Sequence, residues 1–149
     1  MSCILFNMSK IVCFFLLGLS FTLSGCNSGI NDRSLVFLMP DEAEVIIEEG
    51  ERAFLGGQKA IVLVDPRPTW NYRKGHIPQA INIPFGQLKY QMWQLDNASV
   101  IIIAGETYND AVAIAMSKSL IEHGFNDVRT LRGGLTAWED AGKPVSTNQ

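Results

Sequence analysis

Two uninterrupted aliphatic runs, Ile61–Val64 and Val100–Ile103, constrain the fold of this chain more than any other feature. Neither run alternates apolar with polar residues, so both faces of each strand must be buried, as in a parallel sheet covered by helices. We predict further strands at residues 36–39, 81–83 and 128–131, and helices at residues 41–55, 84–93, 110–123 and 135–141. Strands that alternate with helices predict one α/β domain, residues 35–149, with helices on both faces of a parallel sheet.

The beginning of the chain has the parts of a secretory signal peptide. Lys10 supplies a positive charge, residues 11–21 form an apolar stretch, and small residues follow. A stretch of about a dozen apolar residues is shorter than the roughly 20 that a helix needs to cross a bilayer. We therefore predict that residues 1–25 are a signal peptide, with translation starting at Met1 or Met8.

Residues 23–26 read Leu-Ser-Gly-Cys, which resembles the lipobox of bacterial lipoproteins. The resemblance implies that the thiol of Cys26 carries a lipid, and two or more acyl chains give a stable membrane anchor. Asn27 follows in place of Asp, which by resemblance to enterobacterial sorting favours the outer membrane, with the domain in the periplasm. Residues 26–34 are then predicted to be the lipidated cysteine and a flexible polar tether in the cell envelope.

The positions of the cysteines limit the chemistry of the domain. All three cysteines lie in the first 26 residues, so the domain has no disulfide, no thiolate metal ligand and no thiol nucleophile. Only two histidines are present, far apart in sequence, and we predict neither a metal site nor a bound cofactor. The formal net charge is −3 and basic residues do not cluster, which argues against binding to nucleic acid.

Several spaced motifs resemble the rhodanese family. Residues 64–67 (Val-Asp-Pro-Arg) and 75–84 (Gly-His-Ile-Pro, then Ala-Ile-Asn-Ile-Pro) are similar to its first signature, and residues 131–145 to its C-terminal signature. The similarity extends from about Leu35 to Val145 and implies a rhodanese-like fold. Active members carry a cysteine directly after the fourth strand. The N–H groups of the loop that follows lower the pKa of the thiol and hold the persulfide during sulfur transfer.

The corresponding segment of this chain departs from the family, because it contains neither cysteine nor arginine. The strand register places the missing cysteine at Ala104 or Gly105, whereas counting back from Gly124 without a gap places it at Thr107. We interpret the segment as a vestigial active-site loop, made of Ala104, Gly105, Glu106, Thr107, Tyr108, Asn109 and Asp110. Thr107 and Tyr108 carry hydroxyl groups, but no motif places a histidine base near them, and we interpret both as ordinary loop residues.

The charges of the loop also oppose the chemistry of the family. Glu106 and Asp110 place carboxylates where an anionic sulfur donor would enter, and we expect them to repel it. Asp110 or Asn109 is expected to cap the next helix and to occupy the positive end of its dipole. By resemblance, Asp65 and Arg67 support the loop and pair with each other.

Other polar and aromatic residues are interpreted as structural. Asn71 stands where family members often have Glu, which weakens the expected pairing network. We predict packing and hydrogen bonding for His76, and a structural role at a helix C-terminus for His123. Four aromatic residues are interpreted as core or half-buried cover, with a binding surface as the alternative: Trp70, Tyr72, Tyr90 and Trp93.

Three functions remain open. The first, which we favour, is a binding module without catalysis, whose residues Glu106, Thr107 and Tyr108 contact an envelope protein or a small ligand. The second is a sulfurtransferase of the thiosulfate or persulfide type that works without a cysteine of its own, through the thiol of a partner. The third is an envelope lipoprotein whose domain is mainly structural. An intact scaffold without a nucleophile favours the first.

Overall fold

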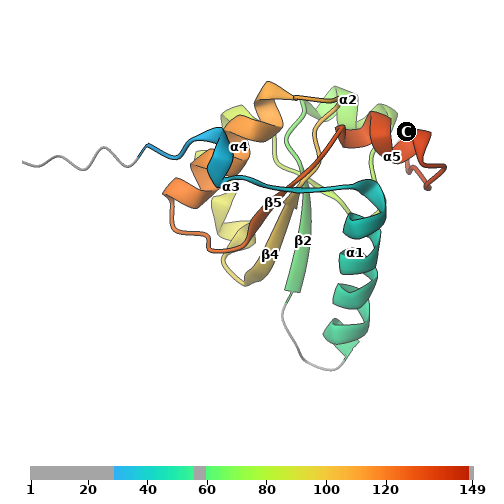
Figure 1. The fold of residues 1–149 in the computed structure, drawn as a ribbon, viewed down its shortest axis with the longest axis horizontal. Coiled ribbons are helices and arrows are strands. Elements are labelled where there is room, and N and C mark those ends of the chain that lie inside the picture. Colours follow the sequence, from blue (N-terminus) through green and yellow to red (C-terminus); the bar gives the residue numbers. More distant parts are fainter. Residues whose placement is uncertain (1–28, 56–59, 148–149) are drawn as a thin grey trace, which may run out of the picture.

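The protein contains a five-stranded, fully parallel sheet with strand order β1-β5-β4-β2-β3 (Figure 1). The computed structural model describes residues 29–55 and 60–147. The strands are β1 (Val36–Leu38), β2 (Ala60–Asp65), β3 (Ile81–Asn82), β4 (Ala98–Ile103) and β5 (Val128–Leu131). The predicted parallel α/β fold is confirmed, and every predicted strand is present within two residues of its expected bounds.

The helices cover both faces of this sheet. Figure 1 shows α1 and α5 on one side and α3 and α4 on the other. The helical elements are α1 (Pro40–Leu55), α2 (Thr69–Lys74), η2 (Phe85–Gln87), α3 (Leu88–Gln91), η3 (Met92–Leu95), α4 (Ala111–Glu122) and α5 (Gly134–Asp140), where η is a 3-10 helix.

Two details of the helices differ from prediction. The single helix expected over residues 84–93 is divided into η2, α3 and η3, and its first turn contains Gly86, a poor helix former. Helix α2 was not expected, because it has only six residues and buries none of them, so it carries no apolar periodicity.

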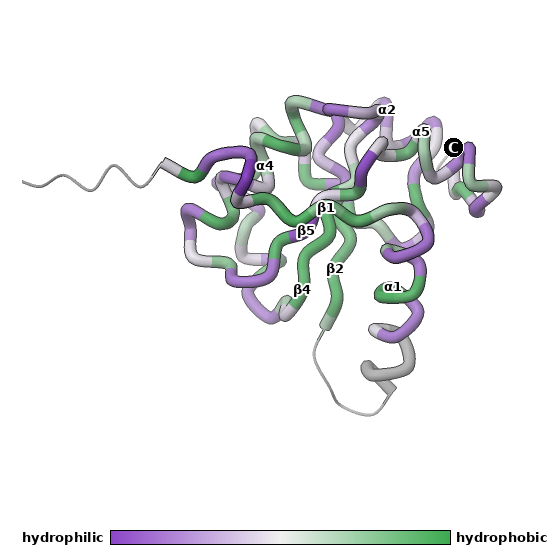
Figure 2. The backbone as a smooth tube through the Cα atoms, in the orientation of Figure 1, coloured by the Kyte–Doolittle hydropathy of each residue, from purple (hydrophilic) through white to green (hydrophobic). Residues whose placement is uncertain are grey.

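Strand β4 shows how the sheet divides the interior into two cores. Ile102 packs in a core shared with Ala43 of α1 and Trp138 of α5, whereas Ile101 and Ile103 face a second core. The second core includes residues from α3, η3 and α4, namely Leu88, Leu95, Ala113, Met116 and Leu120. Successive side chains of a strand point to opposite faces, so one aliphatic run supplies both cores. Figure 2 shows the same runs as the apolar centre of the chain.

The N-terminal approach to the domain is part of the fold. Asp32–Ser34 form the 3-10 helix η1, capped by the side chain of Asn31, which accepts a hydrogen bond from the Arg33 N–H. Asp32 also pairs with Lys118 of α4 at 2.6 Å. The flexible tether expected through residue 34 is therefore too long, because its last three residues form a 3-10 helix and the first of them, Asp32, pairs with α4.

The predicted signal peptide and Cys26 lie outside the described residues. Among the residues that are described, no helix is both long and apolar enough to span a bilayer. The same residues contain no group of three or more metal-ligating side chains.

Lys143 ties the C-terminal segment to the beginning of α1. Its ammonium lies 2.8 Å from Asp41 and 2.5 Å from Glu44, and its side chain is only 8% exposed. The hydrogen bond to Asp41, then that to Glu44, raises the pKa of Lys143 above its ordinary value. The two carboxylates thus stabilise the protonated amine in the folded protein.

Replacing Lys143 should therefore have a pH-dependent effect on stability. A raised pKa means that the folded state binds the proton more tightly than the unfolded state does. The protonated Lys143 contributes its full stabilisation of the folded state at pH values below about 10.4, the pKa of lysine in the unfolded chain. This stabilisation is lost as the pH rises through the higher pKa of Lys143 in the folded protein. We expect Lys143→Met to lower Tm near pH 8 and the difference from wild type to shrink in strongly alkaline buffer. Lys89→Met, at an exposed position, is the control, and a Tm difference independent of pH would contradict this account.

Candidate functional site

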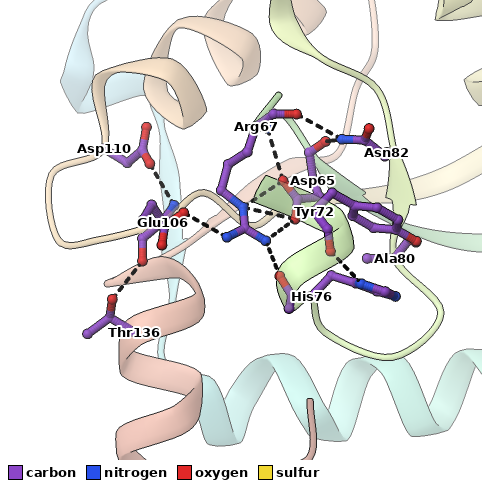
Figure 3. Close-up of polar contacts among 10 residues, drawn as sticks. Asp65, Arg67, Tyr72, His76, Ala80, Asn82, Glu106, Asp110 and Thr136 are labelled. Atoms are coloured by element: carbon purple, nitrogen blue, oxygen red, sulfur yellow. Dashed lines mark hydrogen bonds and ion pairs between the residues drawn. The ribbon is translucent and has the colours of Figure 1, made fainter. Parts of the chain in front are cut away.

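The candidate site is the segment Ala104–Asp110, which connects β4 to α4 at the carboxyl edge of the sheet. Ala104 and Gly105 are buried, Glu106 and Asp110 are half-buried, and the three residues between them are exposed. The turn after β2 and the beginning of α5 flank this loop (Figure 3). The structure thus brings together the seven loop residues and the supporting pair expected from the sequence.

Arg67 is the central cation of the site, and it is buried. Its Nε donates to both carboxylate oxygens of Asp65 at 3.0 Å, and its Nη2 donates to Asp65 at 2.5 Å and to the carbonyl of Gly75 at 2.6 Å. Its Nη1 donates to Oε2 of Glu106 at 2.7 Å. Burial alone would lower the pKa of Arg67, but the hydrogen bonds and charges of Asp65 and Glu106 outweigh it and raise that pKa. Arg67 is therefore a fixed positive charge that connects β2 to the loop.

The contact between Arg67 and Glu106 was not expected. Half of the Glu106 side chain is buried, and its carboxylate shares the single positive charge of Arg67 with Asp65. The three groups together still carry a net negative charge, so the expected repulsion of anions by the loop stays a prediction. Glu106 adds a second carboxylate to Arg67, besides that of Asp65. The opposite charges of Glu106 and Arg67 were the feature of the sequence that could have predicted this contact.

Asp110 uses both of its carboxylate oxygens to accept hydrogen bonds from backbone N–H groups of the loop and of α4. Its Oδ1 accepts hydrogen bonds from the N–H groups of Val112 at 2.8 Å and Ala113 at 3.1 Å, so it caps α4. Its Oδ2 accepts a third from the N–H of Glu106 at 2.6 Å. Of the two caps considered from the sequence, Asp110 has this role, and Asn109 has a positive φ of 57°. The anion at the helix N-terminus is therefore a side chain of the protein itself.

The beginning of α5 fixes the other side of the loop. The N–H of Leu135 donates to the carbonyl of Gly105 at 2.9 Å, and Thr136 donates through its N–H and its hydroxyl to the carbonyl of Glu106 at 3.0 and 2.9 Å. The backbones approach so closely that a Cβ on Gly134 would lie 2.6 Å from the carbonyl carbon of Gly105. Sequence reasoning missed Thr136, because nothing near it in the chain indicates this contact.

The exposed tip of the loop carries hydroxyl groups, and neither of the two histidines, both within the described residues, lies beside them. Tyr108 is 54% exposed, and its ring lies over Gly133. His123 follows the last residue of α4, so the length of that helix, about 18 Å, separates it from the loop. His76 is buried, stacks on Tyr72 with ring centroids 3.8 Å apart, and lies 2.8 Å from the Tyr72 carbonyl through Nδ1. A carbonyl only accepts, so Nδ1 carries the proton, and both histidines have structural environments.

A small hollow of about 220 Å³ lies between the loop and β1. Thr107, Asn109 and Asp110 form its loop side. Arg132, whose guanidinium lies 4.8 Å from the centre of the Phe37 ring, forms part of the opposite wall. The hollow has room for one side chain or a small organic group.

Three of the four aromatic residues interpreted as core or cover lie at the surface. Tyr90 is 75% exposed, Trp93 is 70% exposed and Trp70 is 61% exposed. Only Tyr72 is half-buried, and its hydroxyl donates to the carbonyl of Ala80 at 2.6 Å. The prediction was wrong for the other three because α2, α3 and η3 are short and bury few side chains.

Fold and site together define an α/β domain with its candidate site in a strand-to-helix loop at the carboxyl edge of a parallel sheet. A family model described as rhodanese-like domain matches residues 47–141. The chain therefore belongs to the rhodanese-like domain family.

Individual proteins are also similar to this chain. The thiosulfate sulfurtransferase GlpE of Pseudoalteromonas translucida is 32% identical over 81 residues, which are 54% of this chain and 75% of that protein. The uncharacterized protein BU052 of Buchnera aphidicola is 30% identical over 100 residues, which are 61% of this chain and 64% of that protein. The crystal structure of the BH2092 protein from Bacillus halodurans superposes with a TM-score of 0.62 at 22% identity, covering 77% of this chain and 79% of that one.

Proposed function

We propose that this protein is a membrane-anchored rhodanese-like domain of the bacterial cell envelope that binds a partner and does not transfer sulfur through a cysteine of its own. The supporting observation is the carboxylate of Asp110, which accepts hydrogen bonds from three N–H groups around the loop. An anionic sulfur donor would need those groups. The lipid on Cys26 and its outer-membrane location are part of the proposal.

The chemistry of the loop argues against the family reaction in two further ways. No residue after Cys26 has a thiol, and a Cys26 that carries lipid through its sulfur has none to offer. Glu106 occupies Nη1 of Arg67, the arm of this buried cation that reaches the loop. A donor anion would therefore meet satisfied N–H groups, a neutralised arginine and no nucleophile.

The loop tip is the proposed binding surface. Thr107, Tyr108 and Asn109 are exposed beside the hollow, and the guanidinium of Arg132 supplies a positive charge there. The partner is an envelope protein or a small ligand that contacts these residues. The alternative is sulfur transfer, the activity for which the Pseudoalteromonas relative is named, carried out here through the thiol of a partner.

Transfer of sulfur from thiosulfate to cyanide tests the catalytic side of the proposal. We expect the full-length protein, purified from bacterial membranes, to have no turnover above a heat-inactivated control. The two candidate cysteine positions differ, because Gly105→Cys would place its Cβ 2.5 Å from Oδ2 of Asp110, whereas Ala104 already carries a Cβ. Ala104→Cys should fold but stay inactive while Asp110 holds the loop. Combining it with Asp110→Ser, which keeps a helix cap and removes the charge, should give measurable transfer.

The outcomes separate the two functions. Turnover by the wild-type protein alone would sink the proposal, and turnover only after addition of a thiol-bearing envelope protein would favour the alternative. The binding role is tested by cross-linking in intact envelopes. Combined Thr107→Ala and Tyr108→Ala should abolish a cross-linked product that Trp70→Ala, the control at an exposed residue outside the loop, leaves in place.

A further inference from the structure

The chain enters the domain on one side of the sheet, next to α4. Asp32 pairs with Lys118 at 2.6 Å, and in Figure 1 the N-terminal segment crosses beside α4. Cys26 precedes Asp32 by six residues, which span at most about 20 Å when fully extended. A domain of this size has a radius of gyration of about 13 Å and is thus more than 30 Å wide. A membrane anchor at Cys26 would therefore hold the α4 side of the domain close to the bilayer.

The same side exposes large aromatic and apolar groups. Leu88 and Leu95 fix α3 and η3 in the core that α4 also covers, and Tyr90 and Trp93 from these two elements are 75% and 70% exposed. Val112 of α4 is 40% exposed. We call the exposed residues Tyr90, Trp93 and Val112 the α3–α4 face.

Helix α4 has an unusual composition for a helix at the surface. Its sequence, AVAIAMSKSLIE, contains two charged residues, Lys118 and Glu122, and Lys118 is paired with Asp32. Surface helices normally carry a strongly polar outer face, and helices that lack one are usually covered. No described residue covers Val112, Tyr90 or Trp93, which are all exposed. This side of the domain therefore has the composition of a contact surface.

We infer that the α3–α4 face lies against the phospholipid bilayer, with Tyr90 and Trp93 in its headgroup region. The inference rests on the lipid anchor of the proposed function. Tyr and Trp favour the membrane interface because their rings are apolar and their OH and N–H groups remain hydrated. The short connection to Cys26 makes this face the one that a bilayer meets. The helices α1 and α5 are then directed away from the membrane.

Tryptophan quenching by brominated lipid tests this orientation. The lipidated full-length protein is reconstituted in phosphatidylethanolamine and phosphatidylglycerol vesicles with or without bromine on the acyl chains. Trp138 is only 3% exposed, so Trp70 and Trp93 are the exposed reporters. Helix α2, which carries Trp70, packs through Tyr72 against the core on the other side of the sheet, so Trp70 is the matched control.

The expected results differ between two conservative variants. Trp70→Phe retains Trp93, and its exposed-tryptophan emission should fall at least about twofold in brominated vesicles. Trp93→Phe retains Trp70 and should lose this quenching. Flotation with vesicles, compared with Cys26→Ser, measures the anchor independently. If the wild-type protein does not float, the anchoring proposal fails. If it floats and Trp93 is not quenched, the inferred orientation is overturned. The α3–α4 face would then be exposed to water or covered by a second copy of the protein.

Discussion

Arg67→Ala is expected to lower the free energy of unfolding by about 3–5 kcal/mol, because it leaves a buried carboxylate without its cation. Asp65 is 2% exposed and accepts three hydrogen bonds from the guanidinium, and the carbonyl of Gly75 loses a donor as well. Glu106 would lose the contact that holds its side chain at the loop. The loss should appear as a lower midpoint in urea unfolding with an unchanged m-value.

Two variants separate this effect from general loss of charge. Arg129 pairs with Asp127 at 2.7 Å but is 27% exposed, so Arg129→Ala should cost no more than about 1 kcal/mol. Glu106→Gln removes a half-exposed partner and leaves the pair with Asp65 intact, so its cost should also be about 1 kcal/mol or less. Equal losses for Arg67→Ala and Arg129→Ala would show that burial of the Asp65–Arg67 pair does not cause the large loss of stability.

Gly134→Ala is expected to have the second large effect, through the backbone. Gly134 has a φ of 56°, and an added Cβ would lie 2.6 Å from the carbonyl carbon of Gly105 and 2.8 Å from that of Glu106. Left-handed strain costs about 1–2 kcal/mol and overpacking typically another 1–3 kcal/mol, so a total of about 2–5 kcal/mol is expected. Because the methyl group pushes α5 from the loop, amide hydrogen exchange should rise at Leu135 and Thr136 in particular.

Gly142→Ala isolates the strain from the collision. Gly142 also has a positive φ, 72°, but no atom lies within 4 Å of its hypothetical Cβ. Thermal unfolding of this variant should show only the smaller loss of about 1–2 kcal/mol. If the two variants lost the same stability, close approach of the two backbones would not be the reason for a glycine at position 134.

The sequence predicted the fold well because the information for it is local. The runs that became β2 and β4 are continuous aliphatic segments, and no other element type buries such short runs on two faces. Residue type and position likewise restricted the helix cap to Asp110 or Asn109, and the structure assigns it to Asp110. Helix α2 and the exposure of Trp93 were not predictable in this way, because short helical pieces lack a full apolar period.

The contacts of the candidate site depend on features that are distant in sequence. Glu106 meets Arg67 only because β4 lies beside β2 in the sheet, a pairing that no local pattern encodes. The same holds for the hydroxyl of Thr136 on the carbonyl of Glu106. The sequence could therefore identify the loop and its altered residues, while the partners of those residues required the three-dimensional structure.

The position of β1 has a consequence for how the protein is made. Within residues 29–55 and 60–147, β1 is the first strand, yet its single neighbour in the sheet is β5, the last strand. During synthesis, residues 36–38 are complete long before residues 128–131, so the sheet cannot close until nearly the whole domain has been released. Such high contact order slows folding. A chain that stays unfolded until its C-terminal strand has been made can also pass through a narrow pore before it folds.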